Sequence, residues 1–207
     1  MEYFKKLTKE KQDRIINAGF TCFAKNGYEK ASMADIAKLA QVSKASLFQY
    51  FGNKIDFYLY LYKLCISMNI KNITDLPQPL PNDFFDRMAI IHKIMIEVTL
   101  QYNGMYDFLY ASLAENAPEI KERIRNTNAE YVSISNDIML KDINWDKFKP
   151  GIDLEMVMNM ITWIDQGYTK SLIGKNMSLD ELSEDMCRYM DLLKQSIYKE
   201  ECLNEGN

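Results

Sequence analysis

Helix-capping residues recur at short intervals near the start of this sequence, and the first 76 residues contain no proline. Ser32 and Ser43 are typical N-cap residues, and Asn53 can cap a further helix directly after a glycine. These caps lie only about ten residues apart, so a helix between two of them has room for about two turns. The spacing therefore predicts two short helices, over about 33–40 and 43–50.

Apolar residues at helical spacing predict longer helices around this short pair. One covers about 8–26, between a cap at Thr8 and a stop at Gly27. After Asn53 the tyrosines alternate as in a strand, but the apolar pattern is too long for a strand, so a helix is expected. The remaining expected helices cover about 54–72, 83–101, 104–115, 118–140, 153–174 and 179–199. The predicted fold class is all-α, with about nine helices.

The formal net charge of −4 is divided unevenly along the chain. Residues 1–60 contain ten Lys or Arg and six Asp or Glu, a balance of +4, whereas the remainder has a balance of −8. The short helices therefore lie in a basic segment that suits a polyanionic partner. No stretch approaches the roughly 20 apolar residues of a membrane-spanning helix, and the N-terminus lacks the apolar core of a secretory signal. A cytoplasmic location without a membrane partner is expected.

Residue types that commonly form catalytic or metal sites are sparse. The four cysteines are scattered without a C-x-x-C pair, and His92 is the only histidine. The glycines form no phosphate-binding loop. We therefore expect no catalytic residue, no metal site, no cofactor and no enzymatic activity. An all-α enzyme stays as an alternative, because acidic clusters such as Glu184-Asp185 also occur in acid–base sites.

The two short helices and the turn 40–42 between them have the form of a helix-turn-helix unit. The apolar side of the second helix is expected to pack on the core, and it consists of Leu47, Phe48 and Phe51. The opposite side presents groups that fit a major groove about 12 Å wide; they are Ala45, Ser46, Gln49 and Tyr50. The pattern alone is equally compatible with a helix-turn-helix DNA-binding unit and with two ordinary short helices of an all-α core.

The stretch from Phe23 to Phe57 resembles the N-terminal region of the TetR family of bacterial regulators. The residues that carry the resemblance, in order, are Phe23, Ala24, Gly27, Tyr28, Ser32, Ile36, Ala37, Ala40, Val42, Ser43, Leu47, Phe48, Tyr50, Phe51 and Lys54. The resemblance implies a three-helix DNA-binding head over 1–53 and a helical ligand-binding and dimerisation domain over 54–207. It also implies a homodimer that pairs through the helices at about 153–174 and 179–199 and binds a double-stranded DNA operator.

The resemblance assigns DNA contacts residue by residue. Expected phosphate contacts are Ser32, Ser43, Tyr50 and Lys54, and the residues expected to face bases or nearby backbone are Lys44, Ala45, Ser46 and Gln49. Three positions depart from the family pattern: Gln41 replaces the usual turn glycine, Ala45 stands where Gly or Pro is common, and Phe48 replaces a tyrosine. Phe48 therefore lacks a phosphate-contacting hydroxyl. A positive φ at Gln41 would cost about 1–2 kcal/mol.

Most methionines and tyrosines follow Lys54, and both residue types can line an adaptable apolar pocket. The resemblance places a pocket among the body helices, with the candidates Tyr62, Met88, His92, Tyr106, Tyr110 and Trp163. Ordinary core packing is the alternative for each of them, and His92, flanked by Ile91 and Ile94, suits a core or boundary position. The predicted function is a regulator, in particular a repressor, that a small and largely apolar effector releases from a palindromic operator. Control by a protein partner, or by no ligand, is the alternative within the same family.

Overall fold

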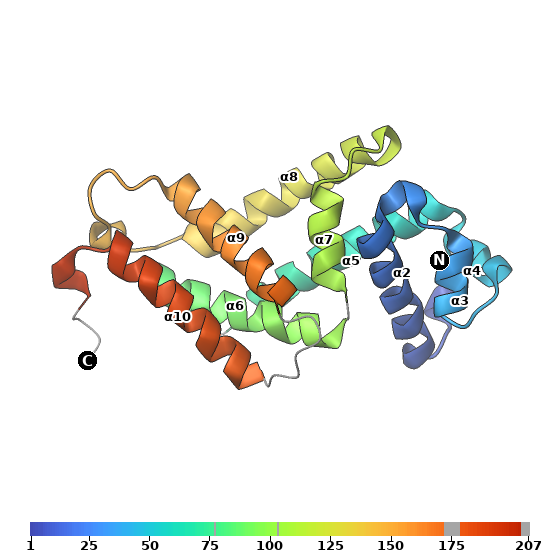
Figure 1. The fold of residues 1–207 in the computed structure, drawn as a ribbon, viewed down its shortest axis with the longest axis horizontal. Coiled ribbons are helices and arrows are strands. Elements are labelled where there is room, and N and C mark those ends of the chain that lie inside the picture. Colours follow the sequence, from blue (N-terminus) through green and yellow to red (C-terminus); the bar gives the residue numbers. More distant parts are fainter. Residues whose placement is uncertain (77, 103, 172–178, 204–207) are drawn as a thin grey trace. The chain divides into compact units, whose positions relative to one another are not determined.

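The computed structural model of the chain describes residues 1–76, 78–102, 104–171 and 179–203, and these residues form helices joined by loops (Figure 1). Their only β-pairing is an isolated bridge between Phe148 and Tyr198. The α-helices are α1 (Glu2–Lys5), α2 (Lys9–Lys30), α3 (Met33–Leu39), α4 (Lys44–Phe51), α5 (Lys54–Thr74), α6 (Phe84–Gln101), α7 (Met105–Leu113), α8 (Pro118–Leu140), α9 (Leu154–Ser171) and α10 (Leu179–Ile197). Two short 3₁₀ helices are η1 (Trp145–Lys147) and η2 (Glu200–Cys202). The predicted all-α class is confirmed.

Each of the nine predicted helices is present, and most begin within two residues of the expected position. Gly27 interrupts α2 with φ 69° and ψ 175°, as its predicted role as a stop requires, and one more turn follows it. The short elements α1, η1 and η2 were not predicted, because three or four residues are too few to show a helical period. The predicted end of α9 at residues 172–174 lies outside the described residues.

The described chain forms two compact units. Unit 1 consists of Met1–Asp75 and Val98–Asn136, and unit 2 consists of Leu76–Glu97 and Asp137–Asn207. These units are defined by how densely their residues contact one another. The predicted boundary near residue 53 instead separates a DNA-binding region from a ligand-binding region, and it stays a prediction. No helix of the described residues is long and apolar enough to cross a membrane.

In unit 1, α2 packs against α7, α3 and α5 (Figure 1). Gly19 of α2 allows the approach of α5, because a Cβ atom there would lie 2.6 Å from Leu61 Cδ1 and 2.8 Å from Phe57 Cζ. Aromatic rings fill the same interior, including Phe23, whose ring centroid lies 4.9 Å from that of Tyr58. Helices α2 and α5 are therefore closely packed against each other, with aromatic side chains between them.

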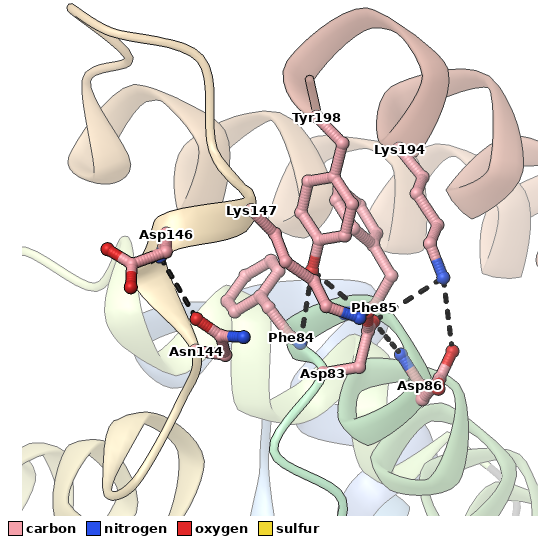
Figure 2. Close-up of polar contacts among 9 residues, drawn as sticks. All are labelled: Asp83, Phe84, Phe85, Asp86, Asn144, Asp146, Lys147, Lys194 and Tyr198. Carbon is pink, nitrogen blue, oxygen red and sulfur yellow. Dashed lines mark hydrogen bonds and ion pairs between the residues drawn. The ribbon is translucent and has the colours of Figure 1, made fainter. Parts of the chain in front are cut away.

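In unit 2, the carboxylate of Asp83 joins the start of α6 to η1 and α10 (Figure 2). It accepts hydrogen bonds from the backbone N–H groups of Phe85 and Asp86, so it caps α6 as its sequence position predicts. The ammonium groups of Lys147 and Lys194 lie 3.0 and 3.5 Å from its oxygens. One buried acidic side chain thus holds three segments that are far apart in the sequence.

Candidate DNA-binding interface

The turn between α3 and α4 has the geometry that the helix-turn-helix prediction requires. Gln41 has φ 55°, a left-handed conformation, so the cost expected of a non-glycine residue applies here. The turn is closed by a hydrogen bond in which Val42 N–H donates to Ala37 O at 2.9 Å. Arg14 of α2 donates from Nε to Ala40 O at 2.9 Å and so caps the C-terminal end of α3. This role of Arg14 was not predicted, because the sequence shows Arg14 only as one of the basic residues of the first 60.

The inner side of α4 is anchored by Leu47 and Phe51, both buried as predicted. Tyr50 is also buried, with 7% of its surface exposed, so its predicted place on the outward side of α4 is wrong. Phe4 of α1 causes this difference, because its ring packs 4.8 Å from Phe51 and 6.1 Å from Tyr50 between ring centroids. The unpredicted helix α1 therefore covers part of α4.

The outer side of α4 is formed by exposed side chains of Lys44, Ala45 and Gln49, with Ser46 half-buried beside them. Phe48 belongs to this outer side too, with 39% of its surface exposed, so its predicted place among the core anchors is wrong. The reason is geometric, since Phe48 is turned by about 100° from the fully buried Leu47. The helix therefore presents one mixed surface, with a cation, an amide and an aromatic ring.

The predicted helix starts are confirmed by hydrogen bonds from first-turn N–H groups to cap side chains, namely Asp35 N to Ser32 Oγ (3.1 Å), Ser46 N to Ser43 Oγ (3.0 Å) and Asp56 N to Asn53 Oδ1 (2.8 Å). The first turns of α3 and α5 also contain a carboxylate each, from Asp35 and Asp56. These carboxylates lie at the positive, N-terminal end of each helix dipole. The first turn of α4 contains no acidic residue. Of the three helix starts, that of α4 is therefore the best suited to a phosphate group.

The ammonium group of Lys54 is already bound within the protein, whereas a lysine that is to contact phosphate would be expected to be free. Its ammonium donates to Tyr28 O at 2.8 Å and to Glu29 O and Ala31 O at 3.2 Å, and it lies 4.3 Å from the centroid of the Tyr28 ring. An ammonium has three donors, and each has a carbonyl acceptor here. Lys54 thus ties the start of α5 to the end of α2.

Glu115, between α7 and α8, completes this junction. Its carboxylate accepts from Tyr28 N–H at 2.9 Å and from Ala117 N–H at 3.0 Å. Burial alone would raise the pKa of Glu115, but these backbone hydrogen bonds, one from Asn116 N–H and the charge of Lys54 outweigh burial and lower it. Glu115 was not predicted as a functional residue; its place just before Pro118, at a helix start, is the only sign of its role in the sequence.

The six residues proposed for an effector pocket fall into different units: Tyr62, Tyr106 and Tyr110 lie in unit 1, and Met88, His92 and Trp163 lie in unit 2. Four of them are buried and Tyr110 is half-buried, whereas Trp163 is 66% exposed and lines no interior.

Tyr106 and His92 are buried candidates that lie next to polar side chains. Tyr106 donates from its hydroxyl to Asn69 Oδ1 at 2.8 Å. His92 Nε2 lies 2.6 Å from Asp165 Oδ1, within ion-pair distance but outside hydrogen-bond geometry. His92 is therefore a buried residue with an acidic neighbour, and its part in an effector pocket stays a prediction. Among the described residues, no group of three or more His, Cys, Asp and Glu could hold a metal ion.

Comparison with known proteins gives a consistent result. Residues 15–61 match the family described as "Bacterial regulatory proteins, tetR family". The negative transcriptional regulator IcaR of the biofilm operon icaADBC of Staphylococcus aureus is 26% identical over 175 residues, which cover 84% of this chain and 90% of that protein.

Two solved structures show the same fold. A TetR family transcriptional regulator from Chloroflexus aurantiacus superimposes with a TM-score of 0.66 at 22% identity, over 96% of this chain and 98% of that one. FadR of Bacillus subtilis in complex with stearoyl-CoA superimposes with a TM-score of 0.56 at 20% identity, over 86% and 96%. The chain therefore has the N-terminal region and the fold of a TetR family transcriptional regulator.

Proposed function

We propose that the protein is a homodimeric repressor that binds a near-palindromic operator and leaves it when a small, largely apolar effector binds. The observation that carries the proposal is the arrangement of α4, which buries Leu47 and Phe51, exposes Lys44, Ala45 and Gln49, and has no acidic residue in its first turn. A helix with this arrangement can lie in a major groove with its polar side towards the bases.

The proposed contacts divide into two groups. Ser43 and the first turn of α4 bind phosphate, with Ser32, Tyr50 and Lys54 as further phosphate contacts, whereas Lys44, Ala45, Ser46 and Gln49 face bases. Lys54 and Tyr50 need more rearrangement than the others, because one is fully hydrogen-bonded and the other is buried. Phosphate contacts set the position on DNA, and base contacts set the sequence preference.

The proposed dimer face lies on α9 and α10. Met156, Met160 and Trp163 form one exposed apolar stripe on α9, and Tyr189 and Leu192 are exposed on α10. Apolar stripes at helical spacing that lack a cover in one chain are suited to packing against a second copy. A twofold dimer would place two α4 helices about 34–36 Å apart, one helical turn of DNA.

The proposed effector carries a long apolar portion. Support comes from the solved FadR structure, which contains stearoyl-CoA. The proposed mechanism is a population shift, in which the effector binds better to a form of the dimer whose two heads do not fit adjacent major grooves. Release of DNA by stearoyl-CoA at stoichiometric concentration, measured by fluorescence anisotropy of labelled operator, tests this step. If neither stearoyl-CoA nor free stearate releases the DNA at saturating concentration, an acyl effector is rejected.

Selection of bound sequences from a random pool of double-stranded DNA tests the whole proposal. We expect enrichment of an inverted repeat whose half-sites are one helical turn apart. A Lys44→Ala variant should bind that operator at least tenfold more weakly, while Lys141→Ala, which removes the same charge from an exposed position of unit 2, should bind like the unaltered protein. Failure to enrich any sequence would reject the proposed function.

A further inference from the structure

Phe48 is the large apolar side chain that α4 exposes, and every residue of α4 is described in the structure. Its neighbours on the inner side are buried, with exposed fractions of 0% for Leu47 and 4% for Phe51. The exposure of Phe48 therefore does not reflect loose packing of the helix. An aromatic ring left in water on a DNA-binding helix is unfavourable in the free protein. A favourable contact in the DNA complex would account for its position.

The surroundings of Phe48 form an apolar strip between two polar groups. Ala45, three residues earlier, is exposed on the same side of α4. Lys44 lies on one edge, with its ammonium 5.8 Å from the centroid of the Phe48 ring, and the exposed amide of Gln49 lies on the other. A phenyl ring has no hydroxyl to donate to a phosphate, so Phe48 lacks the polar contact that a tyrosine would make at this position.

The floor of the major groove offers one apolar group, the C5-methyl of thymine, and Phe and Ala are residue types that contact it. The polar edges of the strip match the neighbouring chemistry, because an amide suits adenine N6 and N7 and an ammonium suits guanine O6 and N7. We propose that Phe48, together with Ala45, recognises thymine methyl groups and so determines the sequence preference of the protein. This inference rests on the proposed function as a DNA-binding repressor.

The test removes one methyl group at a time from the DNA. After the operator has been selected from a random pool, each thymine of one half-site is replaced by deoxyuridine, which differs only by the missing C5-methyl. Affinity is measured by anisotropy at one fixed salt concentration. We expect one or two of these replacements to weaken binding about three- to tenfold, the size expected for one buried methyl group.

Protein variants then connect the effect to the ring. With Phe48→Ala the penalty for deoxyuridine should disappear at one of those positions at least, because the methyl group there has lost the ring as its partner. Phe48→Tyr keeps the ring and should keep the penalty, and Lys44→Ala should also keep it while weakening binding throughout. Circular dichroism checks that each variant folds, which the exposed position of residue 48 favours.

The outcomes separate the two claims. If a sequence is enriched but every deoxyuridine replacement changes affinity less than twofold, DNA binding stands and the methyl contact is rejected. A penalty that persists in Phe48→Ala at every one of these positions assigns the methyl groups to other residues and also rejects the inference. If no sequence is enriched, the proposed function fails and this inference fails with it.

Discussion

Gln41 holds a left-handed backbone conformation that glycine adopts without steric cost. We expect Gln41→Gly to raise the free energy of unfolding by about 0.5–1 kcal/mol, because relief of strain exceeds the entropy that glycine adds to the unfolded chain. Urea denaturation measures the change. Gln41→Ala keeps the Cβ atom and is the matched control, for which no gain is expected. A loss of stability in Gln41→Gly would contradict strain at this position and point to stabilising contacts of the glutamine side chain.

Lys54 is hydrogen-bonded to backbone carbonyls and is also a proposed phosphate contact, and DNA binding measured over a series of salt concentrations can separate these two roles. In Lys54→Met, three backbone carbonyls lose their donor, so we expect the free energy of unfolding to fall by about 1–2 kcal/mol. If Lys54 also contacts phosphate, its loss should reduce the slope of log K against log salt concentration by about one. Weaker DNA binding with an unchanged slope would show that Lys54 positions the head without contacting DNA. Lys141→Ala is again the charge control.

At the scale of elements, Asp83 links α6, η1 and α10 of unit 2. Burial alone would raise the pKa of Asp83, but the hydrogen bonds from Lys147 and Asp86 N–H and the charges of both lysines outweigh burial and lower it. The unfolded chain, with an ordinary pKa of about 3.9, then binds this proton more readily than the folded chain. The stability from Asp83 is therefore present above about pH 4 and is lost as the pH falls through the folded pKa.

Asp83→Asn should accordingly lower the free energy of unfolding at pH 7 by about 2–3 kcal/mol, since two partly buried ammonium groups lose their counterion. The gap between the two proteins should narrow below pH 4. Urea denaturation at several pH values measures it. Asp86→Asn is the matched control, because Asp86 also lies near Lys194 but its side chain is largely exposed; a change below 1 kcal/mol is expected there. An equal loss in both variants would contradict the central role of Asp83.

The elements also show how far sequence reasoning reached. Periodic apolar residues and local caps such as Ser43 and Asp83 act over a few residues, so the long helices and their starts were predictable. The outward side of α4 was only partly predicted, because Phe48 and Tyr50 exchange places relative to expectation. The burial of Tyr50 involves Phe4, about 45 residues away in the chain, and a helical wheel contains no information on such a contact. The junction formed by Lys54 and Glu115 was missed for the same reason.

For the whole molecule, the dimer proposal depends on the exposed stripe of α9. Trp163→Glu combined with Leu192→Glu should make the chain monomeric at micromolar concentration, because two carboxylates would be buried in an apolar interface. Operator affinity should fall by at least tenfold, since each monomer holds only one half-site. Sedimentation velocity and anisotropy measure the two effects. Thr162→Glu is the control, because Thr162 is exposed on another side of α9. If the doubly substituted protein stays dimeric, the interface lies elsewhere.

The exposed position of Trp163 has an optical consequence. The two tryptophans of the chain, Trp145 and Trp163, both belong to unit 2, so tryptophan emission reports on that unit alone. Covering Trp163 by a second chain should shift its emission to shorter wavelength and protect it from acrylamide quenching. Residues 1–75 contain no tryptophan. A Phe48→Trp variant in which Trp145 and Trp163 are replaced by phenylalanine would therefore contain a single tryptophan, located on α4.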